Sequence, residues 1–304
     1  MRTVAVLLVL LLGASACDRA VATPAGPASP AVAGTETRTL RVGNLDRSYR
    51  VHAPASSAGK TGVPVVIVLH GGGGNGAQVE KQTGFSDLAD RKGFIAVYPN
   101  GSGRTKLLTW NAGACCAYAR DQGIDDVGFL RALIDRFDGS PVYVTGFSNG
   151  AMLAYVAGCE LADRIVAIAP VSGAMDMPSC TPARPLSVYA IHGSADPIVP
   201  YAGGTSSSKI ANPARAGSHR SVAYAVKFWT SADRCGAASS TSRGAITTVR
   251  YAGCADGTEV RLDTVAGGKH AWPGGQANRP GADAPTTELD ATESIWSFFA
   301  THDG

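Results

Sequence analysis

The sequence has few charged residues, and nowhere do charges of one sign gather in a dense run. Of its 304 residues, 17% are Asp, Glu, Lys or Arg, and 27 basic against 24 acidic side chains leave a net charge of +3. Because a nucleic-acid-binding surface needs a basic patch, we expect no nucleic-acid partner. Apolar residues make up 45% of the chain, which is enough to bury a full hydrophobic core.

The apolar run at the start of the chain is too short to cross a membrane. Residues 4–12 are all apolar and follow Arg2, whereas a membrane-spanning helix needs about 20 such residues. A short apolar run behind a basic residue is typical of a signal peptide. We therefore predict a signal peptide of the lipoprotein type over residues 1–16, and an exported protein.

Small residues directly precede the first cysteine. The sequence Ala14-Ser15-Ala16-Cys17 resembles a bacterial lipobox, in which Cys17 becomes the lipid-bearing first residue and anchors the protein to the cell membrane. An ordinary signal peptide cleaved after the same small residues would leave Cys17 unmodified and the protein secreted. Residues 17–36 are rich in Ala, Pro, Ser, Thr and Gly, so we expect a flexible tether before one folded domain over residues 37–304.

Metal-ligand patterns are absent from the sequence. No Cys-x-x-Cys motif or closely paired histidines occur, so we expect no metal site and no other cofactor. Cysteines in an exported chain instead indicate disulfides. Cys235 and Cys254 bracket a Ser/Thr/Gly-rich loop and the strand-like run 246–251, and we expect these two to pair. The partners of the other four stay open: Cys115, Cys116, Cys159 and Cys180.

Apolar patterning predicts strands that alternate with helices. Short β-branched runs bounded by Gly or Pro indicate buried strands, and longer runs with helical spacing lie between them. The predicted strands are 37–42, 49–53, 65–69, 94–98, 142–145, 165–169, 187–191, 249–252 and 260–265. The predicted helices are 85–92, 125–137, 149–157, 222–229 and 289–299. This alternation predicts an α/β fold with a mostly parallel central sheet and helices on both faces.

One Ser lies in a pattern that is typical of a catalytic nucleophile. Residues 146–150 have the form G-x-S-x-G around Ser148, directly after one predicted strand and directly before a helix. A sharp strand-to-helix turn of this kind presents the Ser hydroxyl at the edge of the sheet. Because a hydroxyl is a poor nucleophile at neutral pH, it needs a base, and the base needs an orienting acid.

The acid and the base are expected on loops that follow later strands, in the order Asp and then His. Asp196 follows the strand 187–191, and His270 follows the strand 260–265 within a glycine-flanked loop. We therefore predict a catalytic triad of Ser148, Asp196 and His270. His219 precedes a predicted helix and Asp176 lies close behind the strand 165–169, so neither is chosen.

A glycine-rich turn after the strand 65–69 is suited to holding an oxyanion. Its glycines let backbone amides approach a substrate closely. We assign the backbone amides of Gly72 and Asn149 as donors, with Gly71 and Gly73 as competitors for the place of Gly72. A phosphate-binding loop is the rival interpretation, but no Lys-Ser/Thr pair follows the glycines, so that pattern fails.

Two tryptophans are candidates for substrate contact. Trp272 stands beside the predicted base, and its flat apolar face could contact an acyl or ring group. Trp110 precedes Cys115 and Cys116 and could form a wall of the cleft. A surface loop pinned by a disulfide explains the Trp110 segment equally well.

With these motifs in hand, the chain resembles the exported polyhydroxybutyrate depolymerase and feruloyl-esterase-like group of α/β-hydrolases. The matching segments are residues 69–75, 110–116, 125–130, 146–152, 191–201 and 267–275. The resemblance implies an α/β-hydrolase catalytic domain over 37–304, with Ser148, Asp196 and His270 in the roles given above. It also implies the Cys235–Cys254 bridge.

We therefore expect a serine carboxylesterase that acts through an acyl-enzyme. Its substrates would be small-molecule or oligomeric esters with short acyl, hydroxyalkanoate or feruloyl groups. An acyltransferase on the same fold is one alternative, because a sugar or lipid hydroxyl could replace water as the acceptor. A catalytically silent lipoprotein that binds ligands is the other.

Overall fold

A computed structural model describes residues 34–207 and 218–302. The predicted signal peptide, Cys17 and most of the predicted tether lie outside these residues. The first strand begins at Gly34, so the folded domain starts three residues before the expected boundary at residue 37. Within residues 34–207 and 218–302, no helix is long and apolar enough to cross a membrane.

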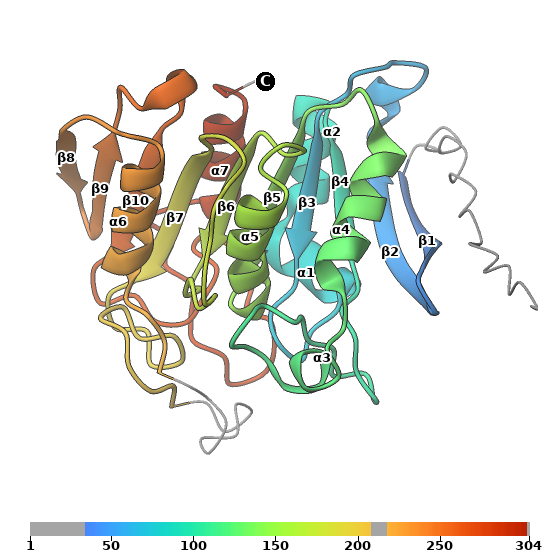
Figure 1. Ribbon diagram of the computed structural model, residues 1–304, viewed down its shortest axis with the longest axis horizontal. Coiled ribbons are helices and arrows are strands. Elements are labelled where there is room, and N and C mark those ends of the chain that lie inside the picture. Colours follow the sequence, from blue (N-terminus) through green and yellow to red (C-terminus); the bar gives the residue numbers. More distant parts are fainter. Residues whose placement is uncertain (1–33, 208–217, 303–304) are drawn as a thin grey trace, which may run out of the picture.

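A ten-stranded sheet runs through the whole domain (Figure 1). Its strand order is β1-β2-β4-β3-β5-β6-β7-β10-β9-β8. The six strands from β4 to β10 pair in parallel, and antiparallel strands extend the sheet at both edges. The strands are β1 (Gly34–Val42), β2 (Leu45–Ala53), β3 (Val65–Leu69), β4 (Ile95–Pro99), β5 (Val142–Phe147), β6 (Ala167–Val171), β7 (Ser187–Gly193), β8 (Ala238–Arg243), β9 (Ile246–Tyr251) and β10 (Val260–Val265).

Helices cover both faces of this sheet, as expected for an α/β-hydrolase fold. Helices α4, α5 and α6 lie on the face that is nearer in Figure 1, and α1, α2 and α7 lie behind the sheet. Each face has its own apolar core, because the strands between them are buried on both sides. The helices are α1 (Gly76–Thr83), α2 (Phe85–Lys92), α3 (Ala117–Asp121), α4 (Asp126–Ile134), α5 (Asn149–Glu160), α6 (Val222–Ala232) and α7 (Ala291–Phe299).

The parallel strands explain why distant residues can meet at one site. Strands β3, β5, β6, β7 and β10 run in the same direction, so their carboxyl ends lie along one edge of the sheet. In open α/β sheets, ligands bind at the edge formed by the carboxyl ends of the parallel strands. The segments that follow these five strands carry the predicted oxyanion turn, the Ser148 turn, Asp176, Asp196 and His270 in that order.

Three elements of the described residues were not predicted from the sequence, namely strand β8 and helices α1 and α3. Strand β8 lies in the segment that the sequence analysis describes as a Ser/Thr/Gly-rich loop. All six of its residues are exposed, so its sequence lacks the apolar alternation from which a strand is predicted. It is an edge strand, and its pairing with β9 holds it in the sheet. Helix α1 follows the glycine turn, where Asn75 caps it by accepting a hydrogen bond from the Gln78 amide at 3.0 Å.

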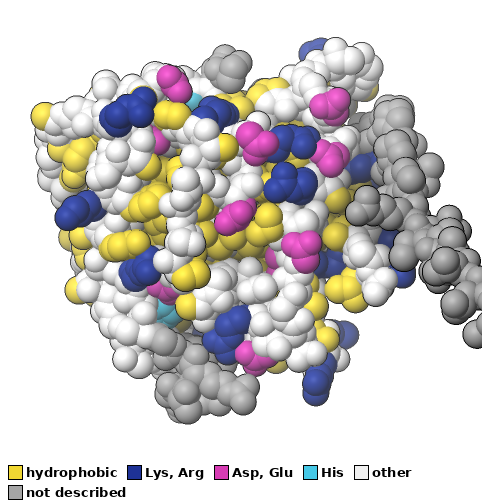
Figure 2. Space-filling view, viewed as in Figure 1, with side chains coloured by type: hydrophobic (Ala, Val, Ile, Leu, Met, Phe, Trp, Pro, Cys, Tyr) yellow, Lys and Arg dark blue, Asp and Glu magenta, His cyan; other side chains and the backbone are white. Residues whose placement is uncertain are grey.

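The surface matches the small net charge. On the face seen in Figure 2, basic and acidic side chains are interspersed among apolar ones rather than gathered by sign. Over α4 and α5, basic and acidic side chains lie near one another, so this face has no patch of one sign.

Candidate active site

Ser148 occupies a strained turn between β5 and α5. Its φ of 57° lies in the left-handed region that few residues other than glycine adopt. The flanking glycines are required by close packing: a Cβ atom on Gly146 would lie 2.6 Å from the Gly150 carbonyl carbon, and one on Gly150 would collide with the Leu69 carbonyl. The turn therefore holds the Ser148 side chain at the end of the sheet, clear of β3 and β5.

A chain of hydrogen bonds joins Ser148 to two residues from other loops. The Ser148 Oγ atom lies 2.9 Å from Nε2 of His270, and Nδ1 of His270 lies 2.7 Å from Oδ2 of Asp196. Asp196 follows β7 and His270 follows β10, as the sequence predicted. The His270 ring also packs against Phe147, with 4.7 Å between ring centroids. The fold thus brings all three predicted residues into contact.

The loops that carry Asp196 and His270 are bonded to each other. The Ala195 amide donates to the Gly268 carbonyl at 2.9 Å, and the Gly267 amide donates to Ser194 Oγ at 2.8 Å. These bonds fix the separation of the two loops, so the contact between the carboxylate and the imidazole does not depend on side-chain rotamers alone.

Asp196 is buried and yet stays acidic. Burial alone would raise its pKa, but the hydrogen bond and charge of His270, with the Val199 amide, outweigh it, so the pKa of Asp196 is lowered. Its second oxygen accepts hydrogen bonds from the Ile198 and Val199 amides at 2.8 and 2.9 Å. The carboxylate therefore remains an acceptor for the His270 ring.

His192 supports this carboxylate from behind. Its Nε2 atom donates to the Val199 carbonyl at 2.8 Å and lies 3.5 Å from Asp196 Oδ2. Burial lowers the pKa of His192, which keeps the ring neutral. It lies near the end of strand β7, close to Asp196.

The predicted oxyanion donors lie close together. A Cβ atom placed on Gly72 would stand 3.7 Å from the Asn149 Cβ. In the described part of the chain, the backbone amides of Gly72 and Asn149 have no hydrogen-bond acceptor. The Gly73 amide, by contrast, donates to the Leu108 carbonyl at 2.7 Å, which removes it as a competitor. Gly71 lines the same cavity as Gly72.

The Asn149 side chain has a separate role from its amide. Its Oδ1 atom accepts a hydrogen bond from the Trp110 amide at 2.8 Å, and its Nδ2 atom donates to the Trp110 carbonyl at 3.1 Å. Both groups are buried. The side chain therefore clamps the loop that carries Cys115 and Cys116 against the start of α5.

The two predicted tryptophan contacts are wrong, because neither indole reaches the cavity. Trp110 is 0% exposed, and its Nε1 atom donates to the His70 carbonyl at 2.9 Å. Trp272 is also 0% exposed and donates to Thr292 Oγ1 at 3.0 Å, behind the sheet in the α7 core. Both rings hold site loops in place from within the core.

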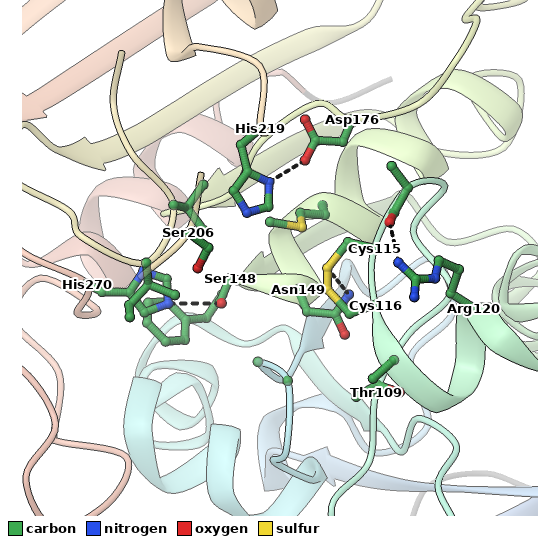
Figure 3. A pocket seen from close by; sticks show the side chains of 18 of the residues that line it. Thr109, Cys115, Cys116, Arg120, Ser148, Asn149, Asp176, Ser206, His219 and His270 are labelled. Carbon is green, nitrogen blue, oxygen red and sulfur yellow. Dashed lines mark hydrogen bonds and ion pairs between the residues drawn. A yellow bond between two sulfur atoms is a disulfide. The ribbon is translucent and has the colours of Figure 1, made fainter. Parts of the chain in front are cut away.

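A cavity of about 270 Å³ opens beside Ser148 (Figure 3). Ser148, His270, Gly72 and Asn149 line one part of it. Other residues of its wall, most of which the sequence did not single out for the site, include Cys115, Cys116, Arg120, Met152, Asp176, Ile198, Val199, Ser206, Ser218, His219, Asn278 and Arg279. The cavity can hold a small group within reach of the Ser148 hydroxyl.

Disulfides brace the loops around the site. Cys235 is bonded to Cys254 as expected, although this bond lies away from the cavity. The four cysteines left open pair as Cys115–Cys116 and Cys159–Cys180. The second bond ties the loop after β6 to helix α5.

Asp176 and His219 form a site feature that sequence reasoning missed. Oδ2 of Asp176 lies 2.6 Å from Nδ1 of His219, and both side chains line the cavity. The one available signal was the place of Asp176 after a parallel strand. Nothing local marks His219, because its partner is 43 residues earlier in the chain.

Comparison with known proteins agrees with this geometry. A family model described as "Esterase PHB depolymerase" matches residues 47–211. The chain is 32% identical over 278 residues to a "Putative esterase NocK" of Nocardia uniformis subsp. tsuyamanensis, covering 83% of this chain and 78% of that protein. It is 29% identical over 236 residues to "Feruloyl esterase B" of Piromyces equi, covering 74% of this chain but 42% of that longer protein.

A solved structure with the same fold is an acetyl xylan esterase from Aspergillus awamori. The TM-score is 0.54 at 15% sequence identity, over 87% of this chain and 99% of the other. At this identity the likeness concerns the fold alone. The family match, which spans more than half of the chain, concerns the sequence itself. The chain therefore belongs to the esterase PHB depolymerase family of α/β-hydrolases and is a carboxylic ester hydrolase.

Proposed function

We propose that this hydrolase cleaves esters through a Ser148–His270–Asp196 triad. The observation that supports it is the continuous hydrogen-bonded chain, with 2.9 Å from Ser148 Oγ to His270 Nε2 and 2.7 Å from His270 Nδ1 to Asp196. His270 takes the hydroxyl proton as Oγ attacks the ester carbonyl carbon. Asp196 accepts the Nδ1 hydrogen, which leaves Nε2 free to act as the base, and stabilises the imidazolium that forms.

The negative charge of the tetrahedral intermediate is held by backbone amides. We assign this role to Asn149 and Gly72, whose amides have no acceptor within residues 34–207 and 218–302 and whose residues line the cavity. His270 then passes its proton to the leaving alcohol, and an acyl group stays on Ser148. Water attacks this acyl-enzyme, again with His270 as the base, and releases the acid.

The substrate class follows from the size of the cavity and from the relatives. A cavity of about 270 Å³ can hold a short acyl chain or a single ring. The relatives named above include a putative esterase and a feruloyl esterase. We therefore propose short acyl, hydroxyalkanoate-oligomer or feruloyl esters as substrates.

The same proposal includes export and, through Cys17, a lipid anchor. Three disulfides within the described residues support an oxidising compartment. Mass spectrometry of the N-terminus of membrane-extracted protein tests the anchor. A diacylglyceryl adduct on Cys17 is expected, and it should be lost in Cys17→Ala; an unmodified N-terminal Cys17 would mean a secreted protein.

The catalytic proposal is tested by Ser148→Ala with p-nitrophenyl butyrate as substrate. We expect kcat to fall by at least about 10³-fold, because the residual rate comes from binding and the oxyanion amides alone. Ser242→Ala on the exposed strand β8 is the matched control and should behave as the unaltered protein. A fluorophosphonate probe should label the unaltered enzyme at Ser148. Turnover by Ser148→Ala at the normal rate would contradict the mechanism.

A further inference from the structure

A second His–Asp pair lies in the wall of the cavity, outside the proposed triad. Asp176 comes from the loop after β6, and His219 comes from the segment that leads into α6. Their side chains are 5% and 9% exposed, and Nδ1 of His219 lies 2.6 Å from Oδ2 of Asp176. Figure 3 shows this pair above Ser148, on the same side of the cavity as Ser206.

The pair is held by contacts on both members. The other oxygen of Asp176 accepts a hydrogen bond from the Arg220 amide at 2.8 Å, and the backbone of His219 makes two 2.9 Å bonds with Gly204. The Asp176 carbonyl accepts from the Ala114 amide at 3.3 Å. The Cys159–Cys180 bond closes the same loop onto α5. The orientation of the His219 ring is therefore set by the fold.

This arrangement leaves one ring nitrogen for a ligand. Because the Asp176 carboxylate accepts the Nδ1 hydrogen, the neutral ring carries its lone pair on Nε2. Nε2 has no hydrogen-bond partner in the described ranges 34–207 and 218–302. In Figure 3 this nitrogen lies on the side of the ring that faces the labelled cavity residues. It is an oriented acceptor directed at the substrate space.

The rest of the cavity wall is partly polar, with Arg120, Ser206, Ser218 and Asn278 among its residues, and partly apolar. Met152, Ile198 and Val199 line the cavity, as does the bonded pair Cys115–Cys116. A few oriented polar atoms among apolar side chains are the usual source of specificity in such cavities. A substrate hydroxyl placed here would find its acceptor in Nε2 of His219, whereas an alkyl group in the same place would leave Nε2 without a hydrogen-bond donor.

We propose that His219, oriented by Asp176, accepts a hydrogen bond from a hydroxyl group of the ester substrate. The inference rests on the proposed function, since the ester must be bound at Ser148. It makes His219 a specificity-determining residue and Asp176 its positioning residue. The enzyme should prefer esters that carry a free hydroxyl over their counterparts without it. One hydrogen bond between neutral groups corresponds to about a tenfold preference.

The test compares kcat/KM for three ester pairs that differ in one hydroxyl. They are methyl 3-hydroxybutyrate and methyl butyrate, methyl 4-hydroxycinnamate and methyl cinnamate, and 2-hydroxyethyl butyrate and ethyl butyrate. The unaltered enzyme should favour the hydroxylated member about tenfold in at least one pair. His219→Leu should bring that ratio close to one, mainly through KM. His219→Gln, whose amide can reach the position of Nε2, should restore part of it.

Two further variants separate positioning from general damage. Asp176→Ala should lower the same ratio, and combining it with His219→Leu should lower it no further, because both act through one hydrogen bond. His52→Leu is the control, because it alters another His–Asp pair that does not line the cavity. In that pair His52 Nε2 of β2 lies 3.0 Å from Asp90 of α2. The variant should keep the ratio of the unaltered enzyme.

Three outcomes would overturn the inference. These are no preference in any pair, an unchanged ratio in His219→Leu, or an equal loss on both members of a pair. None of them touches the triad proposal, which fails only if Ser148→Ala keeps its activity. A His219→Leu variant that does not react with a fluorophosphonate probe has lost its active site as a whole. In that case the hydroxyl preference of His219→Gln, compared with that of the unaltered enzyme, tests the inference.

Discussion

Asp233 should make the folded protein less stable as the pH rises. It ends helix α6 and is 0% exposed. One of its oxygens accepts from the Leu186 amide at 3.2 Å, and the other has no partner within the described residues. Burial raises the pKa of Asp233 from 3.8 to about 6, although the Leu186 amide and Arg234 partly oppose this.

The sign and the size of the effect follow from proton linkage. Between pH 3.8 and about 6 the folded protein holds a proton on Asp233 that the unfolded chain has already released. The free energy of unfolding therefore falls as the pH rises through this window, and the cost is complete above it. Since one pKa unit corresponds to about 1.4 kcal/mol, ionised Asp233 costs the folded state at most about 3 kcal/mol at pH 7.5.

Asp233→Asn removes this cost and keeps the shape and the acceptor for Leu186. Urea unfolding at pH 4.0 and pH 7.5, with disulfides intact, gives the stability of variant and unaltered protein at each pH. We expect the advantage of the variant to grow by about 2.5 kcal/mol from the lower to the higher pH, because a small part of the cost is already present at pH 4.0. Any effect of the amide on packing is the same at both values and cancels. Asp163→Asn, at an exposed residue whose charge is not among the causes of the Asp233 shift, is the control.

A stability difference that does not change with pH would refute this reasoning. It would mean that water or a local shift solvates the second oxygen of Asp233 in the folded protein. A difference that changes in the opposite direction would mean that the ionised carboxylate has a favourable partner.

Three further predictions concern the buried polar groups of the site. Burial lowers the pKa of His70 to about 4, so unfolding free energy should drop by up to about 3 kcal/mol as the pH falls from about 6.5 to 4, and His70→Gln should flatten this profile in urea titrations. Asn149→Asp places an oxygen against the Trp110 carbonyl and should lose about 3 kcal/mol at pH 7, measured by thermal unfolding. Asp196→Asn should lower kcat by about 10⁴-fold with near-normal KM, because the His270 tautomer is no longer fixed.

The elements that place the proposed triad could be predicted because their signals are local. Strands β3 and β10 have the predicted bounds, and helix α2 does as well. Each has a continuous pattern, and a Gly follows within two residues of its end. Ser148, Asp196 and His270 stand directly after such strands, and parallel pairing then brings them to one edge of the sheet.

The tryptophans could not be assigned in the same way. An indole ring next to a site residue in the chain serves equally well as a wall of the cavity or as core beneath a loop. Trp272 packs against Phe85 with 6.1 Å between centroids, a contact across 187 residues that depends on how α2 and the His270 loop meet. Its sequence position beside His270 does not contain that information.

Buried polar contacts between distant segments position the loops that form the cavity wall. The adjacent residues Asp125 and Asp126 show why such contacts are hard to predict from the sequence. Both resemble the start of a helix, and Asp125 does cap α4 through the Gly128 amide at 2.7 Å. Asp126 instead bonds Arg47 and the Asn111 amide, each at 2.7 Å, and so fixes the loop that carries Cys115 and Cys116. The two neighbouring carboxylates thus have unrelated roles, because only Asp126 contacts the Arg47 guanidinium of strand β2. The same holds for Asp176, because its contact with His219 depends on the fold and cannot be read from the residues around it in the chain.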